Sequence, residues 1–275
     1  MSPVAPSALL PSMSETLDFS RRAYVAEEMD GPCSYEELRH CLRHLAIVNR
    51  ITLAHQHTLR WLDRMLRAPH AADPRRTFRL MDIGCGYGDM LRRIERWAQP
   101  RGIHMELIGA DINANALRAA REATPATSRI QWVLGDVCTS PETQEVDLIV
   151  SCGVFHHLDE HEIVRLLRWM DSTAALGWYV TDLQRSATSY RVFDLLMRGP
   201  WWQRFIRPDG LRSIRRSFRP EEWATMCAEA GLAASDVAIE PCRPARLCVG
   251  RANPNAVLAS RVHESGSTAL HREPS

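Results

Sequence analysis

The feature that most constrains the fold is a glycine-rich turn that follows a short apolar run. Residues 78–83 end in Asp82-Ile83 and lead directly into Gly84, Gly86 and Gly88. Glycine permits positive φ and lets a ligand approach the backbone closely. A strand, a glycine turn and a helix in this order form the ligand-binding corner of many open α/β sheets. The turn therefore predicts a binding site at the C-terminal edge of a parallel sheet.

Short apolar runs alternate with amphipathic stretches along most of the chain, which is typical of βαβ units and predicts an α/β fold. We expect strands near 78–83, 105–111, 130–134, 146–151, 176–182, 234–240 and 245–250, and helices near 89–98, 114–123, 160–171 and 220–230. Upstream, Leu38, Leu42 and Leu45 recur at helical spacing after a capping box of Ser34 and Glu37.

The expected organisation is a disordered tail at 1–17, an N-terminal helical segment at 18–72, a main domain at 73–251 with a cap insertion at about 183–219, and a disordered tail at 252–275. Both tails are rich in small and polar residues and have no periodicity. The segment at 183–219 interrupts the strand pattern.

Composition excludes several classes of protein. The chain has 34 basic residues, all arginine, against 33 acidic ones, so it lacks the charge footprint of a nucleic-acid binder. It has no lysine for Schiff-base chemistry, and its 8 cysteines form no CxxC pair. No window approaches the roughly 18 apolar residues of a membrane helix, and Met1–Met13 contain no basic residue ahead of an apolar run. We expect no signal peptide or membrane anchor, and a cytoplasmic location.

The charges around the glycine turn indicate which cofactor it holds. A dinucleotide fingerprint needs a small third residue at position 89, but that residue is Asp89, which we expect to cap the next helix. Asp82 and Asp89 would repel a pyrophosphate and attract a cation. S-adenosylmethionine, which has an ammonium, a sulfonium and an adenosine but no phosphate, fits this field.

Two further acids end the next two strands. Asp111 follows Gly109-Ala110, where a carboxylate can accept hydrogen bonds from both hydroxyls of a ribose. Binding sites for NAD share this feature. Asp136 lies in Gly135-Asp136-Val137, where it can accept a hydrogen bond from an adenine amino group. Since parallel strands end at one edge of a sheet, the acids that end the three strands are expected to form one site.

These motifs, together with Asp147-Leu-Ile-Val-Ser151, resemble those of the class I S-adenosylmethionine-dependent methyltransferases of the small-molecule type. The resemblance implies a Rossmann-like α/β fold, with a seven-stranded, mostly parallel sheet, helices on both faces, N-terminal helices and a helical cap. It also implies the cofactor residues Asp82, Gly84, Cys85, Gly86 and Gly88 at the methionine end, Asp111 at the ribose, Asp136 and Val137 at the adenine, and Ile112 and Ser151 nearby.

The candidates for catalysis are His156, His157 and Asp182. Methyl transfer to a hydroxyl requires removal of its proton, which a neutral histidine near pH 7 can accept. The His-His pair with a later aspartate resembles the arrangement in some small-molecule O-methyltransferases. As an alternative, both histidines pack or cap near the cofactor without a chemical role.

A zinc site is the competing interpretation of this segment. His157, Glu160 and His161 match an HxxEH pattern, in which both imidazoles would share a helix face. However, the sequence indicates no third ligand, and Asp159 fits the N-cap of the following helix. We therefore expect no metal.

The acceptor pocket is expected to lie under the added parts of the chain. The cap contains aromatic residues (Trp201, Trp202, Phe205, Phe218) among arginines (Arg198, Arg204, Arg207, Arg212, Arg215, Arg216, Arg219). These arginines either bind an anionic group or form a solvated face. Tyr24, Asn49 and Arg50 from the N-terminal segment can also face the cofactor, but core packing with exposed polar tips is the favoured interpretation.

The sequence thus predicts methyl transfer from S-adenosylmethionine to a small molecule, with a hydroxyl oxygen of an aromatic, polyketide-like or sugar-bearing compound as acceptor. A small-molecule C- or N-methyltransferase, an NAD(P)-dependent oxidoreductase and a non-catalytic cofactor-binding module stay as alternatives. Methylation of nucleic-acid amino groups is disfavoured because Ser151-Cys-Gly-Val154 replaces the Asn/Asp-Pro-Pro-aromatic motif of those enzymes. The sequence leaves the oligomeric state open.

Overall fold

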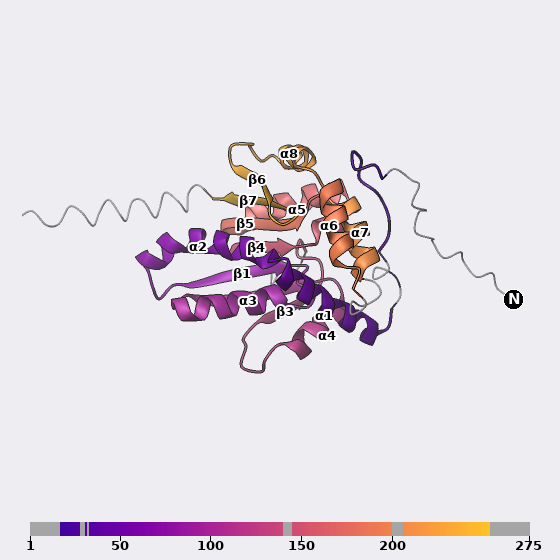
Figure 1. Ribbon diagram of the computed structural model, residues 1–275. Helices are drawn as coiled ribbons and strands as arrows, with labels where there is room; N and C mark the ends of the chain where they lie inside the picture. The colour runs from indigo at the N-terminus through magenta and orange to yellow at the C-terminus, as the bar shows by residue number, and fades with distance from the viewer. Residues whose placement is uncertain (1–16, 28–30, 32, 140–144, 200–205, 254–275) are drawn as a thin grey trace, which may run out of the picture.

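A seven-stranded sheet with strand order β3-β2-β1-β4-β5-β7-β6 forms the centre of the computed structural model (Figure 1). The structure describes residues 17–27, 31, 33–139, 145–199 and 206–253, so both predicted tails lie almost wholly outside the described residues. The strands are β1 (Thr77–Ile83), β2 (His104–Asp111), β3 (Gln131–Leu134), β4 (Val146–Cys152), β5 (Ala174–Leu183), β6 (Val237–Cys242) and β7 (Arg246–Ala252). Strands β1 to β5 pair in parallel, and β7 is antiparallel to β5 and β6. The predicted α/β fold is confirmed.

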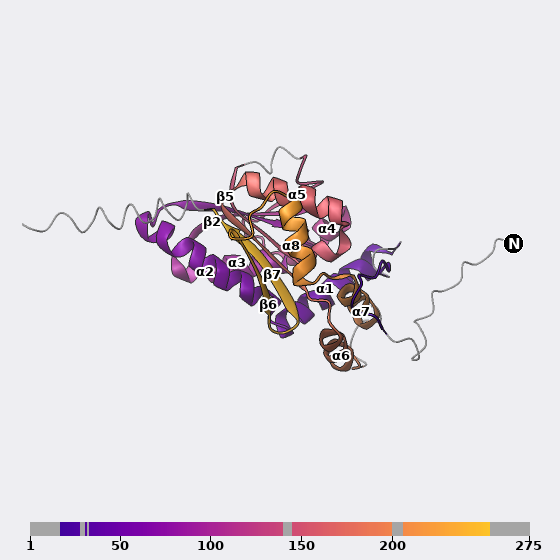
Figure 2. The same ribbon diagram turned by 90° about the horizontal axis from the view of Figure 1, so that it is seen from above.

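Helices cover both faces of this sheet, as Figure 2 shows. On one face, α2 (Ala54–Ala72) and α3 (Asp89–Ala98) share an apolar core with β1 and β4. On the other face, α5 (Glu160–Thr173) and α8 (Pro220–Glu229) share a second core with β5 and β7. Because both faces are covered, the central strands are buried over nearly their whole length. Helices α3, α5 and α8 begin at Asp89, Glu160 and Pro220, as the sequence predicts.

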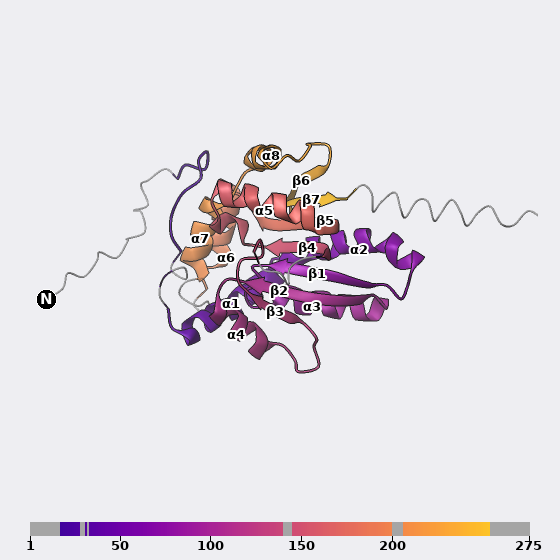
Figure 3. The same cartoon turned by 180° about the vertical axis from the view of Figure 1, so that it is seen from behind.

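The N-terminal segment forms a helix at the C-terminal edge of the sheet. Helix α1 (Tyr35–Ile51) begins at the predicted capping box of Ser34 and Glu37. Its apolar side packs against α4 (Ala114–Ala123). Figure 3 shows these two helices side by side from behind. This contact places α1 beside the strand ends that carry the predicted cofactor residues.

The cap insertion is helical, as predicted. Helix α6 (Ala187–Leu196) packs on α7 (Ile206–Arg216), and both lie near the carboxyl ends of the central strands (Figure 1). The predicted cap residues Trp201, Trp202, Arg204 and Phe205 lie outside the described residues. Within the described chain, none of the helices combines the length and apolar character needed to cross a bilayer.

A buried arginine joins the cap and α8 to residues 17–27, which we call the N-terminal arm. Arg185 is 2% exposed, and its guanidinium donates to the carbonyl of Ser217 at 2.6 Å and to Glu222 at 2.6 Å. Its Nε donates to the carbonyl of Phe19 at 3.1 Å. One charged group thus satisfies acceptors near the N-terminus and, far later in the sequence, at the end of the cap and the start of α8.

We predict that Arg185→Leu lowers the free energy of unfolding by about 3 kcal/mol, because it leaves buried carbonyls and Glu222 without their donor. Urea denaturation measures the loss. Arg129→Leu is the matched control, since Arg129 is exposed, and it should change the stability by less than about 0.5 kcal/mol. Equal stability of the Arg185 variant and the wild type would contradict this role.

Candidate functional site

A cavity of about 910 Å³ opens at the C-terminal edge of the sheet. The predicted site residues that line it are Gly84, Cys85, Gly86, Asp111, Ile112, Asp136, Val137, His156 and His157. The remaining four, Asp82, Gly88, Ser151 and Asp182, are not part of its lining. The cavity therefore has one wall of predicted cofactor residues and another that carries the two histidines.

The glycine turn between β1 and α3 has the left-handed backbone that the sequence indicates. Gly84 and Gly86 have φ values of +64° and +49°. A Cβ at Gly84 would lie 2.4 Å from Cγ2 of Val154, whereas a Cβ at Gly86 would meet only Cδ2 of Leu42, at 3.8 Å. Gly84 is thus required by packing. Gly86 leaves room above the backbone for a ligand.

Asp111 at the end of β2 is held by the backbone around it. Its Oδ2 accepts the N–H of Gly86 at 2.9 Å, and its Oδ1 accepts the N–H of Asn113 at 2.8 Å. Burial raises the pKa of Asp111 above its ordinary value, although these N–H donors oppose the shift. The carboxylate has further lone pairs, so it can accept hydroxyl donors from the cavity that it lines.

Asp82 lies beneath the turn and is 2% exposed. Burial, and then the charges of Asp89 and Asp111, raises the pKa of Asp82 well above its ordinary value. Within the described chain, its carboxylate has no hydrogen-bond partner. The three acids therefore concentrate negative charge around the turn, and a cation in the neighbouring cavity would relieve their repulsion.

The predicted capping role of Asp89 is wrong. Gly88 occupies the N-cap of α3, and Asp89 is the first helical residue. The Oδ2 of Asp89 instead lies 3.3 Å from Nε2 of His55 and accepts from Asn49 at 3.4 Å. Asp89 turns toward α1 and α2 because both helices present polar partners there, which the local sequence does not reveal.

Of the other predicted cofactor residues, Asp136 and Ile112 line the cavity, whereas Ser151 does not. A backbone N–H of Cys138, together with the Arg165 guanidinium, holds the pKa of Asp136 below its ordinary value. Ile112 is 80% exposed at the cavity rim, where its side chain is open to a ligand. Ser151 is buried and donates to the carbonyl of Ile83 at 2.9 Å, so its hydroxyl joins β4 to β1.

The structure brings His156 and Asp182 together. His156 lies in the turn η4 (Phe155–His157) and is buried, and its Nδ1 is 2.7 Å from Oδ1 of Asp182. Its backbone N–H donates to Oδ2 of the same carboxylate at 3.0 Å. Burial would raise the pKa of Asp182, but the charge and hydrogen bond of His156 outweigh it and lower the pKa. The bond to Asp182 fixes the ring and leaves Nε2 on the side away from Asp182.

Sequence reasoning missed Glu27, which completes this cluster. Glu27 is 5% exposed, and its Oε1 lies 3.8 Å from Nε2 of His156 and 4.0 Å from Nε2 of His157. The same oxygen accepts from Ser213 at 2.7 Å and lies 3.7 Å from Arg216. No spacing in the sequence links an N-terminal residue to this histidine pair, so only the fold could reveal it.

Arg22 holds the arm that carries Glu27. Its Nη2 donates to the carbonyls of His156 and Leu158 at 2.9 and 2.7 Å. Of the N-terminal residues predicted to face the cofactor, Asn49 lines the cavity, whereas Tyr24 is exposed and bonds to Glu160. Arg50 lines a different cleft.

Most described arginines of the cap have acidic partners. Arg198 and Arg207 both pair with Asp194, and Arg212 pairs with Asp209. Phe218 is buried in the core rather than facing the cavity. These arginines are therefore neither free to bind an anionic group nor a purely solvated face, because aspartates of the same insertion neutralise them.

The HxxEH interpretation does not fit the geometry. His157 belongs to η4, whereas α5 begins at Glu160 after the predicted N-cap Asp159. Among the described residues, His157, Glu160 and His161 are not a group whose ligand atoms lie close enough to share a metal. The two imidazoles are therefore not neighbours on one helix face.

Comparison with known proteins agrees with this architecture. Residues 80–175 match the family model described as a methyltransferase domain. A trans-aconitate 2-methyltransferase of Azoarcus sp. (strain BH72) is 34% identical over 95 residues, which are 32% of this chain and 34% of the relative. The corresponding protein of Streptomyces avermitilis is 34% identical over 147 residues, 51% of this chain and 52% of the relative. The matches thus span at most about half the length of these relatives.

Solved structures share the fold over a longer range. A plantazolicin methyltransferase in complex with a pentazolic desmethylPZN analog and S-adenosylhomocysteine matches 80% of this chain and 96% of its own length, with 14% identity and a TM-score of 0.55. Human N-acetylserotonin methyltransferase in complex with S-adenosylmethionine covers 80% and 56%, with 17% identity and a TM-score of 0.52. The solved structures thus share the fold of this chain, and the methyltransferase-domain match over residues 80–175 agrees with the sequence motifs.

We predict that Asp82→Asn raises the melting temperature of the ligand-free protein by several degrees near neutral pH. The pKa of Asp82 is raised in the folded state, so ionisation destabilises the fold increasingly as pH rises above the ordinary value of 3.8. The gain should therefore widen as the pH rises above about 4 and level off above the raised pKa of Asp82, as measured by thermal denaturation.

Asp63→Asn is the control, because Asp63 is a more exposed acid that is paired with Arg67. Its effect should be small over the same pH range. A gain for Asp82→Asn that shrinks as pH rises would mean that the negative charge at the turn is already compensated.

Proposed function

We propose that the protein transfers the methyl group of S-adenosylmethionine to a hydroxyl oxygen of an aromatic, polyketide-like or sugar-bearing small molecule. The observation that carries this proposal is the cavity itself, which joins an acid-rich glycine turn to a histidine held by a buried carboxylate. The first part suits a cationic methyl donor, and the second suits removal of a hydroxyl proton.

The cofactor end of the cavity fits S-adenosylmethionine on its charges and its shape. When bound, this cofactor supplies a methyl group on a positively charged sulfur. The acids around the turn favour that cation, and Gly86 leaves space above the backbone. We assign the ribose hydroxyls to Asp111 and the adenine to Asp136 and Val137. The exposed Ile112 offers an apolar surface to the adenine ring.

His156 is the proposed general base. Because Asp182 accepts the hydrogen on Nδ1, the tautomer that presents a lone pair on Nε2 is favoured. A hydroxyl of the acceptor that meets Nε2 can pass its proton to the ring, and Asp182 stabilises the imidazolium that forms. Glu27 lies beside the same nitrogen and can orient the acceptor or the second histidine.

The acceptor end suggests a substrate with a sizeable apolar part. Leu42, Leu45 and Val48 from α1 line the cavity, as do Phe193 and Leu196 from α6. Such walls favour a ring system or an aliphatic chain over a small tricarboxylate like the one named in the relatives. Apolar walls and a positioned base together support O-methylation of a hydroxylated aromatic or polyketide-like compound.

The cap and the N-terminal segment contribute most of these walls, so we propose that residues 18–72 and about 183–219 select the acceptor while the rest of the 73–251 domain binds the cofactor. All eight cysteines are free thiols. This fits the reducing cytoplasm, which is the location we propose.

We predict that Asp111→Asn weakens binding of S-adenosylmethionine by about 1.5–3 kcal/mol, because it removes charge-assisted bonds to the ribose. Isothermal titration calorimetry measures the change. Asp236→Asn, on an acid far from the cavity lining, should leave the affinity as it is. Unchanged binding to the Asp111 variant would remove this residue from the cofactor site.

We predict that His156→Ala lowers kcat by about 10²-fold or more, while cofactor affinity stays within about threefold. An acceptor is first found by transfer of a labelled methyl group to a panel of phenolic and polyketide-like compounds. His161→Ala, on an exposed histidine of α5, is the matched control. Full turnover by His156→Ala would exclude it as the base. Labelling of a carbon or nitrogen atom would instead favour the C- or N-methyltransferase alternative.

A further inference from the structure

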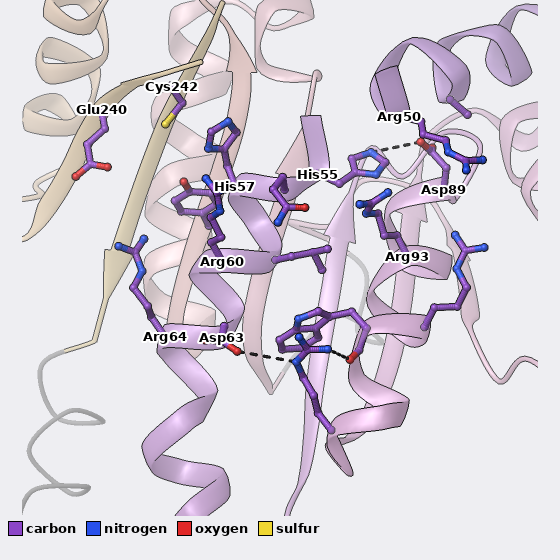
Figure 4. Close-up of a pocket in the computed structure, with 17 residues that line it drawn as sticks. Arg50, His55, His57, Arg60, Asp63, Arg64, Asp89, Arg93, Glu240 and Cys242 are labelled. Carbon is purple, nitrogen blue, oxygen red and sulfur yellow. Dashed lines mark hydrogen bonds and ion pairs between the residues drawn. The ribbon is translucent and has the colours of Figure 1, made fainter. Parts of the chain in front are cut away.

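A second cavity of about 1020 Å³ lies on the face of the sheet covered by α2 and α3. Figure 4 shows Arg60 and Arg64 along α2, with Arg50 and Arg93 nearer to Asp89. Asp89 is the single lining residue that this arginine cleft shares with the cofactor cavity, among the residues given for the two. The cleft is therefore a separate compartment that the proposed methyl transfer does not use.

The cleft has an excess of positive charge. Six arginines line it, against the three acids Asp63, Asp89 and Glu240. Two of these acids already have partners, because Asp63 bonds to Arg67 at 3.0 Å and Asp89 lies 3.3 Å from His55. The arginines come from α1, α2, α3 and the turn after α3, namely Arg50, Arg60, Arg64, Arg93, Arg96 and Arg101.

Most of these guanidinium groups have no acidic partner. Arg101 lies 4.0 Å from Asp63 and donates to the carbonyl of Trp97 at 2.8 Å. Within the described part of the chain, the side chains of the other five make no hydrogen bond or ion pair. The Nε of Arg93 is, in addition, out of contact with solvent and has no partner. A buried donor without an acceptor is unfavourable unless a ligand satisfies it.

This contrasts with the arginines of the cap. Arg198, Arg207 and Arg212 carry the same charge, and each has an aspartate partner within 2.8 Å. The arginines of the cap are thus neutralised by aspartates, whereas most of those around the arginine cleft have no acidic partner. A concave group of unpaired guanidinium forks is the arrangement that binds phosphate or carboxylate groups.

The geometry points to a binding site for a small molecule that carries a diphosphate or longer phosphate chain. A monocarboxylate would neutralise only one of the five unpaired guanidinium groups, whereas a phosphate chain brings several charges and many acceptor oxygens. The cavity volume is close to the upper end of the roughly 300–1,000 Å³ range of small-ligand pockets. The site therefore suits a compact ligand rather than an extended polymer.

Recognition in the cleft would depend on charge more than on ring stacking. Tyr179 already stacks on Trp61, with ring centroids 5.1 Å apart, and the Arg101 guanidinium lies 4.9 Å from the Trp97 ring centroid. One face of each aromatic side chain is thus occupied. The phosphate chain is the part of the ligand that the cleft recognises, so inorganic phosphates are suitable probes.

The test is calorimetric titration of the full chain with pyrophosphate and with tripolyphosphate, in the presence of excess S-adenosylhomocysteine. We expect saturable binding with one site per chain and an affinity that falls as sodium chloride is raised. The double variant Arg60→Gln/Arg64→Gln should bind at least about tenfold more weakly. Both substitutions lie on exposed positions of α2, so folding should be preserved, which circular dichroism checks.

Arg129→Gln is the matched control, because it removes an exposed arginine outside the cleft, and its affinity should stay within about twofold. Absence of saturable binding of both probes, or equal binding by the double variant, would overturn the proposal. So would a short single-stranded DNA that binds at least tenfold more tightly than tripolyphosphate, since the cleft would then be a nucleic-acid surface. The titration needs no acceptor or methyl transfer, so its outcome is independent of the proposed activity.

Discussion

The repulsion among three carboxylates around one glycine turn is the constraint on which the site depends. Asp82, Asp89 and Asp111 lie close enough for the last two to raise the pKa of the first. A chain that only needed to fold would place apolar or neutral residues at such a buried corner. The cluster makes sense when a positively charged ligand occupies the adjoining cavity, and it explains why a pyrophosphate is a poor candidate for the same turn.

The second half of the site depends on a chain segment that lies far from it in sequence. Arg22 donates to carbonyls of the histidine turn, and Glu27 from the same arm reaches both imidazoles. Arg185 holds the arm by its carbonyl at Phe19 and connects it to α8. The histidine turn is therefore held both by Asp182 and by the arm. The general base that we propose, His156, requires this kind of support.

The sequence predicts those features of the fold that local residue patterns determine. The bounds 89–98 and 114–123 match α3 and α4 because the glycine turn and the polar cap at Asn113 determine where those helices begin. Asp111 and Asp136 could be located because parallel strands end at one edge. Glu27 and the partners of Asp89 could not be located, because their contacts depend on how distant helices and the N-terminal arm pack. The arginine cleft has the same origin, since its charges come from α1, α2, α3 and the turn after α3, which only the fold brings together.

The most direct test of the account is calorimetric titration of the purified protein with S-adenosylmethionine, S-adenosylhomocysteine, NAD(H) and NADP(H). The carboxylate argument predicts saturable binding of the first two and no binding of the nicotinamide nucleotides at the cofactor cavity. Binding of a nicotinamide nucleotide to the Arg60→Gln/Arg64→Gln variant, without binding of S-adenosylmethionine, would contradict the account. The acids at the turn would then have to be compensated in a way that admits a pyrophosphate.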